Sequence, residues 1–172
     1  AGGNGKTNRI IELAKVYPYM MFMAPTHDAV KNLKDRAKEL NVNIRVDTYY
    51  KVFGINCRPN DRFDHYTRFV LDECSMVPAE HLTIMMKKLK SNSGFLMAGD
   101  FHQLPCIAPA VPIYDNWTCI KSEEYKKFEV MELTENYRQK EDPKFFDLCN
   151  KLRGELSKNE ALSILKILNT RS

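Results

Sequence analysis

The chain has 172 residues, of which 44% are hydrophobic and 28% are charged, and its formal net charge at pH 7 is +4. These are globular values, and a chain of this length can bury a sizeable core. No apolar run approaches the roughly 20 residues that a membrane-spanning helix needs, and the N-terminus has no signal peptide, so we expect no membrane partner. The mildly basic charge permits nucleic-acid binding without requiring it.

The five cysteines are scattered, odd in number and free of C-x-x-C spacing. This pattern argues against a zinc site. A reducing, intracellular compartment is its simplest setting, with cytoplasm, nucleus and a viral replication site left open.

The first residues, Ala1–Thr7, read AGGNGKT and match the end of the phosphate-binding pattern G-x-x-x-x-G-K-[ST]. The leading glycine of that pattern would fall one residue before Ala1, so we expect a fragment without the buried strand that carries such a loop. Lys6 would reach the β- and γ-phosphates, and the Thr7 hydroxyl would bind Mg²⁺. The alternative is a flexible glycine-rich terminus with a chance GKT. The residues expected to hold the nucleotide are Gly2, Gly3, Asn4, Gly5, Lys6 and Thr7.

The rest of the chain alternates between strand and helix patterns, which predicts an α/β domain with a mostly parallel sheet. The expected helices span residues 7–15, 28–40, 48–53, 78–90, 143–153 and 158–168. The expected strands span residues 19–24, 43–46, 67–71, 94–98 and 130–133.

An acidic pair, Asp72 and Glu73, follows the apolar strand at residues 67–71. Side chains at the carboxyl end of a parallel strand face the crevice where ligands bind. Asp72 would hold Mg²⁺, and Glu73 would orient and deprotonate an attacking water. The alternative is an ordinary acidic turn. The strand at residues 94–98 leads in the same way into a polar loop, GDFHQLP.

Five segments, GGNGKT, APTHDAV, LDECSMV, GDFHQLP and LTENYRQ, follow one another in this order. In this order they resemble consecutive motifs of superfamily 1 DNA helicases, most closely the RecD/Dda branch and its eukaryotic mitochondrial and telomere-associated relatives. The resemblance covers nearly the whole chain. It implies a three-layer, RecA-like P-loop NTPase fold that here lacks the strand before the phosphate loop. Residues 1–139 would form a truncated first motor domain, and residues 140–172 would lead towards a second one.

The resemblance also implies roles for single residues. Gln103 would sense the γ-phosphate, with a loop-capping amide as the alternative. Arg138 would reach the γ-phosphate from the hinge, with a surface ion pair as the alternative. The residues expected to contact single-stranded DNA are Pro25, Thr26, His27, Thr48 and Tyr49. As alternatives, either threonine could be a helix N-cap. Tyr49, and Phe101 as a further candidate for stacking on bases, could instead belong to the core.

These residues together predict the motor domain of an ATP-dependent DNA helicase that uses ATP and Mg²⁺ and acts on single-stranded DNA or a forked duplex. A viral-type superfamily 1 RNA helicase and a cropped nucleotide-binding module without turnover remain alternatives, so RNA stays a possible partner. The motifs of the second motor domain are absent. We therefore expect residues 1–172 alone to show feeble ATPase activity, weak single-strand binding and no unwinding.

Overall fold

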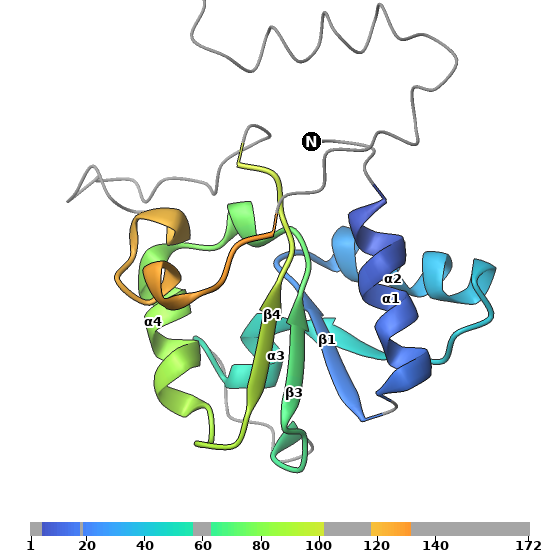
Figure 1. Ribbon diagram of the computed structural model, residues 1–172, viewed down its shortest axis with the longest axis horizontal. Coiled ribbons are helices and arrows are strands. Elements are labelled where there is room, and N and C mark those ends of the chain that lie inside the picture. Colours follow the sequence, from blue (N-terminus) through green and yellow to red (C-terminus); the bar gives the residue numbers. More distant parts are fainter. Residues whose placement is uncertain (1–4, 18, 57–62, 102–117, 132–172) are drawn as a thin grey trace, which may run out of the picture. The chain divides into compact units, whose positions relative to one another are not determined.

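The computed structural model describes residues 5–17, 19–56, 63–101 and 118–131, and all of their helices and strands fall within one compact unit, Lys6–Glu132. A parallel four-stranded sheet forms its centre, in the order β2-β1-β3-β4 (Figure 1). The strands are β1 (Met20–Ala24), β2 (Arg45–Thr48), β3 (Arg68–Leu71) and β4 (Gly94–Met97).

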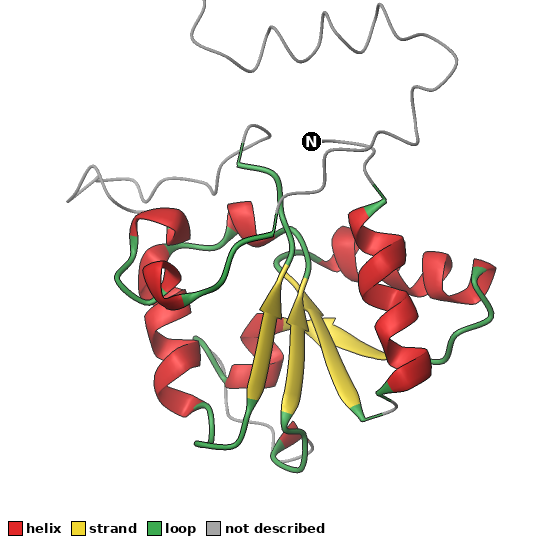
Figure 2. Ribbon diagram, viewed as in Figure 1, coloured by secondary structure: helices red, strands yellow, loops and turns green. Residues whose placement is uncertain are grey.

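Helices cover both faces of this sheet (Figure 2). One face packs against α1 (Lys6–Val16) and α2 (His27–Glu39), and the other against α3 (Tyr49–Phe53) and α4 (Ala79–Lys88). Short 3-10 helices complete the described elements: η2 (Cys74–Met76), η3 (Cys119–Lys121) and η4 (Tyr125–Lys127). The result is the expected three-layer arrangement of helices, parallel sheet and helices.

The sequence of β1, MMFMA, explains why this strand lies inside the sheet. All five of its residues are buried, as expected for a strand that is covered on both faces. Met21 and Met23 pack with α3 and α4, whereas Phe22 and Ala24 pack with α1 and α2. The alternation of side chains along a strand thus supplies both halves of the core.

The register brings the carboxyl ends of the strands to one edge of the sheet. Phe22 of β1 lies opposite Val46 of β2 and Val70 of β3, and Leu71 lies opposite Met97 of β4. Segments that follow β1, β2, β3 and β4 therefore begin at the same edge, which we call the carboxyl edge.

Two predicted boundaries were wrong by a few residues. The second strand is Arg45–Thr48 and not 43–46, because pairing with β1 places Thr48 at the strand end, directly before α3. Pro78 is the N-cap of α4 and not its first residue.

The predicted strand at residues 130–133 is not present at residues 130 and 131, the two that the structure describes. Val130 and Met131 have no regular secondary structure and are 69% and 85% exposed, and no described strand pairs with them. Residues 132–133, the two predicted C-terminal helices and the proposed segment 140–172 lie outside the described residues. Within the described part of the chain, no helix is long and apolar enough to cross a membrane.

Candidate nucleotide-binding site

The GKT segment and the acidic pair meet at the carboxyl edge. The helix α1 begins at Lys6, and the Thr7 hydroxyl donates a hydrogen bond of 3.0 Å to Oδ2 of Asp72. Asp72 directly follows β3, and its backbone N–H donates to the carbonyl of Met23 at 2.9 Å. Gly5 precedes α1 with φ 70°, a left-handed conformation that favours glycine.

Asp72 lies in a shielded position, with 5% of its surface exposed. Burial raises the pKa of this carboxyl, while the hydrogen bonds from Thr7 and from the N–H of Glu73, together with the charge of Lys6, lower it in part. A buried carboxylate beside a hydroxyl and a lysine has the oxygen donors that Mg²⁺ prefers. Among the described residues, no cluster of three or more His, Cys, Asp or Glu side chains could hold a metal ion by itself.

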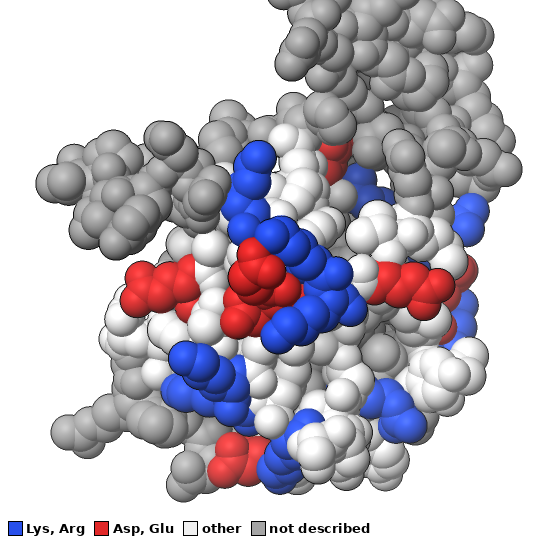
Figure 3. Space-filling model, turned by 60° about the vertical axis from the view of Figure 1, so that its left-hand side comes forward, with Lys and Arg blue, Asp and Glu red and all other residues white. Residues whose placement is uncertain are grey.

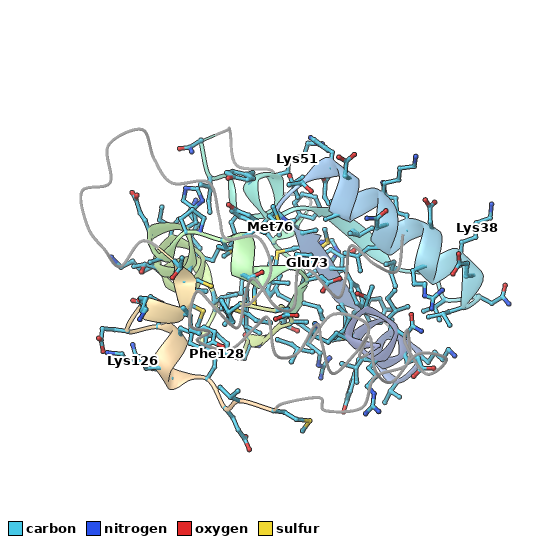
Figure 4. The ribbon with its side chains drawn as sticks, turned by 90° about the horizontal axis from the view of Figure 1, so that it is seen from above. Lys38, Lys51, Glu73, Met76, Lys126 and Phe128 are labelled. Atoms are coloured by element: carbon cyan, nitrogen blue, oxygen red, sulfur yellow. The ribbon has the colours of Figure 1, made fainter. Side chains whose placement is uncertain are left out.

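Glu73 has an unusual backbone. Its φ of 54° and ψ of 40° place it in the left-handed region, and its N–H donates to Oδ1 of Asp72 at 3.0 Å. The view from above, onto the carboxyl edge, places Glu73 near the middle of the domain with Met76 of η2 beside it (Figure 4). Glu73 is half-buried, unlike the buried Asp72 before it.

The segment after β4 also reaches this edge. Its Asp100 is 4% exposed, a buried carboxyl that the sequence reasoning did not assign, although the acidic residue after a strand was a usable signal. Gly99 is in tight contact with the turn after β3: a Cβ there would lie 2.7 Å from Sγ of Cys74 and 3.0 Å from the backbone N of Ser75. The segment directly after β4 thus lies in contact with the turn after β3.

The residues predicted to contact DNA divide into two groups. Thr26 and His27 are exposed at the end of β1, and Thr48 ends β2, at the same edge as Asp72. Both threonines are also helix N-caps: the hydroxyl of Thr26 accepts a hydrogen bond from the N–H of Ala29 at 3.1 Å, and that of Thr48 from Lys51 at 3.4 Å. The alternative reading as caps therefore holds for both.

Tyr49 and Pro25, the other two residues predicted to contact DNA, are buried. Tyr49 is 0% exposed, and its hydroxyl forms a hydrogen bond of 2.8 Å with Nδ1 of His81. Burial lowers the pKa of His81, opposed by the charge of Glu80, which favours the neutral ring that can accept this bond. With no exposed surface, this ring offers no face on which a base could stack.

Neighbouring aromatic side chains are more open. Tyr50 is half-buried and stacks on Tyr49 with ring centroids 4.2 Å apart. Phe101 is half-buried and meets the ring of Tyr125 edge-on at 5.5 Å. The sequence reasoning did not single out Tyr50. Of the other predicted site residues, Gly2, Gly3, Asn4, Gln103 and Arg138 lie outside the described residues.

Charges on the α4 side of the unit are mixed. Figure 3 shows lysine and arginine side chains next to aspartate and glutamate side chains on this face. Lys126 pairs with Glu123, and Lys88 donates to the backbone carbonyl of Phe53. Among the described residues on this face, basic and acidic side chains are thus interspersed.

The domain is a RecA-like P-loop NTPase domain. Three features define it: a parallel sheet covered on both faces, a GKT segment at the start of a helix, and a buried aspartate after a neighbouring strand. The family profile described as "AAA domain" matches residues 1–169, and the chain belongs to this family. Comparison with curated proteins gives no match.

Solved structures of Pif1 helicases share this fold. A structure of two coordinating Pif1 helicases that unwind forked double-stranded DNA is 23% identical, with a TM-score of 0.71 over 92% of this chain and 44% of that chain. Pif1 from Bacteroides in complex with ADP-AlF3 and single-stranded DNA is 22% identical, with a TM-score of 0.72 over 92% and 42%. Pif1 from Candida albicans is 22% identical, with a TM-score of 0.68 over 95% and 41%. The chain thus spans less than half the length of these structures.

Proposed function

We propose that this chain is the ATP-binding motor domain of a DNA helicase. The observation that carries the proposal is the hydrogen bond between Thr7 and Asp72, because it joins the end of the phosphate-binding loop to the acidic strand end. The likeness of the fold to Pif1 helicases, which have been solved with ADP-AlF3, single-stranded DNA and forked duplexes, supports the choice of DNA as partner.

The residues of the carboxyl edge divide the work of ATP hydrolysis. The backbone at Gly5 and the start of α1 would hold the phosphates, with the Lys6 ammonium countering their charge. Thr7 and Asp72 fit the oxygen ligands that Mg²⁺ takes, and a bound Mg²⁺ would neutralise charge on the β- and γ-phosphates. Glu73 would orient a water in line with the γ-phosphate and accept its proton as the water oxygen attacks phosphorus and ADP leaves.

The DNA-facing part of the proposal uses the neighbouring strand ends. Thr26 and His27 after β1, and Thr48 at the end of β2, share the carboxyl edge with Asp72. A strand of DNA held there would lie against the same sheet that carries the nucleotide site. Gln103 and Arg138 keep the roles that the resemblance implies: Gln103 would sense the γ-phosphate, and Arg138 would reach it from the hinge.

The test is ATP hydrolysis by the protein that contains this chain, with Mg²⁺, alone and with single-stranded DNA or single-stranded RNA of the same sequence. We expect hydrolysis that DNA stimulates, together with strand displacement on a tailed duplex. Stimulation by RNA alone would favour the RNA helicase alternative. Nucleotide binding without hydrolysis under any of these conditions would favour a module without turnover.

A further inference from the structure

The turn after β3 needs support from outside itself. Among the described residues other than glycine, only Asn41, Asn56 and Glu73 have a positive φ. Asparagine adopts this conformation readily, whereas a longer side chain such as that of glutamate does so at a cost. Backbone of this kind persists when its surroundings hold it in place. The residues that hold this turn therefore help to decide where the Glu73 carboxylate lies.

Cys74, the residue after Glu73, is held from two sides. From the sheet, its N–H donates to the carbonyl of Ala98 at 2.9 Å. From the opposite side, the Cys119 thiol donates to the carbonyl of Cys74 at 3.0 Å. Cys119 also donates its own N–H to the carbonyl of Val77 at 3.1 Å. One residue thus bonds to both ends of η2, the 3-10 helix that follows Glu73.

Cys119 is itself fixed by its neighbours. It is 0% exposed and Cys74 is 2% exposed. The Ser122 hydroxyl donates to the carbonyl of Cys119 at 2.7 Å and accepts from the N–H of Tyr125 at 3.1 Å. The side-chain hydrogen bond between Cys74 and Cys119, followed by burial, raises the pKa of the Cys74 thiol.

We propose that Cys119 is a positioning residue for Glu73, acting through the backbone of Cys74. This inference rests on the proposed ATP hydrolysis. The segment that contains Cys119 belongs to none of the motifs that carry the resemblance. Its thiol holds the turn so that the Glu73 carboxylate stays aligned with the attacking water. Nucleotide binding does not depend on this contact, because Lys6, Thr7 and Asp72 are held by other bonds.

The experiment compares Cys119→Ala, which removes the donor, with Cys119→Ser, which keeps a donor at nearly the same place. In the protein that contains this chain, we expect Cys119→Ala to lower kcat for ATP hydrolysis about tenfold. This is the change in rate that corresponds to the free energy of about one hydrogen bond. We expect KM and the dissociation constant for ATP to stay within about twofold of the parent values. A tenfold rise in either would mean that ATP itself had lost an interaction worth about one hydrogen bond. Cys119→Ser should restore most of kcat.

Two further variants separate positioning from loss of stability. Leu33→Val, in the core on the other side of the sheet, should lower the melting temperature while leaving kcat unchanged. Ser122→Ala leaves the Cys119 thiol in place but removes the hydroxyl that bonds to its carbonyl, and it should lower kcat severalfold, which gives a second test if Cys119→Ala does not fold.

Unchanged kcat in both Cys119→Ala and Ser122→Ala would overturn the inference while leaving the proposed function intact. So would an equal loss of kcat in Cys119→Ala and Cys119→Ser, because the hydrogen bond would then not be the cause. If the parent protein binds ATP but does not hydrolyse it, the proposed function fails, and the inference fails with it.

Discussion

The hydroxyl of Thr7 donates a hydrogen bond of 3.0 Å to the carboxylate of Asp72, across 65 positions of sequence. This bond connects the start of α1 to the end of β3, the two elements that carry the residues of the candidate site. Burial raises the pKa of the Asp72 carboxyl, and the charge of the nearby Lys6 opposes part of this rise. A cation, a hydroxyl and a carboxylate are thereby assembled at one end of the sheet.

The first prediction concerns Lys6. Lys6→Ala removes the cation that would face the phosphates, and we expect ATP affinity to fall about 10- to 100-fold, the range for one hydrogen bond to a charged group. Lys15→Ala, in the last turn of the same helix, is the matched control and should bind ATP as the parent does. Titration calorimetry with Mg²⁺–ATP measures both. Equal affinities in the two variants would rule out the phosphate-binding role of Lys6.

The second prediction separates the two acidic residues. Glu73→Gln should keep ATP binding and lower kcat about 10²- to 10⁴-fold, because an amide cannot accept the proton of the attacking water. Asp72→Ala should instead weaken Mg²⁺-dependent ATP binding. Calorimetry with and without Mg²⁺, followed by a steady-state hydrolysis assay, distinguishes the two effects. Hydrolysis at the parent rate in both variants would mean that the acidic pair is only structural.

The third prediction follows from the burial of Asp72, which raises the pKa of its carboxyl in the folded protein. A carboxyl with a higher pKa in the folded state than in the unfolded state makes folding less favourable once it ionises. Stability is then lost as the pH rises from about 3.9, the unfolded pKa, through the higher folded pKa. Asp72→Asn, whose amide can still bond to the Thr7 hydroxyl, should therefore melt at a higher temperature than the parent at pH 7.

Thermal unfolding without nucleotide and Mg²⁺ measures this difference, which should shrink as the pH is lowered towards 3.9. Asp35→Asn, an exposed carboxyl on α2, is the control and should change the melting temperature little. A lower melting temperature for Asp72→Asn at pH 7 would show that the bonds of the carboxylate outweigh its burial.

The sequence was sufficient for the parts of this domain that depend on local patterns. The buried run MMFMA, the GKT before α1 and the acidic pair after β3 predicted three elements whose ends meet, because parallel strands place their carboxyl ends together. The surroundings of Tyr49 were not predictable in this way. Its burial depends on His81, which lies 32 residues away on α4, and either face of a short helix could have received the ring. Cys119 gave no signal, since a single cysteine in an irregular stretch has no spacing to read.

The fourth prediction tests the close contact between the segment after β4 and the turn after β3. At Gly99, a Cβ would lie 2.7 Å from Sγ of Cys74, 3.0 Å from the backbone N of Ser75 and 3.1 Å from that of Cys74. The thiol can turn away, but the two backbone nitrogens belong to the turn that holds Glu73 and cannot move without displacing it. Gly99→Ala should therefore destabilise the domain by about 1–3 kcal/mol, the range for overpacking a well-filled site.

Gly94→Ala is the matched control, because nothing lies within 4 Å of a Cβ at that position. It should leave the free energy of unfolding within about 0.5 kcal/mol of the parent value, as at most surface sites. Urea denaturation of both variants measures the difference. Since the displaced turn carries Glu73, Gly99→Ala should also lower kcat for ATP hydrolysis at temperatures where the domain remains folded. A Gly99→Ala variant as stable and as active as Gly94→Ala would show that the two segments have room to separate, and that the loop leading to Gln103 is not coupled to the acidic turn through this contact.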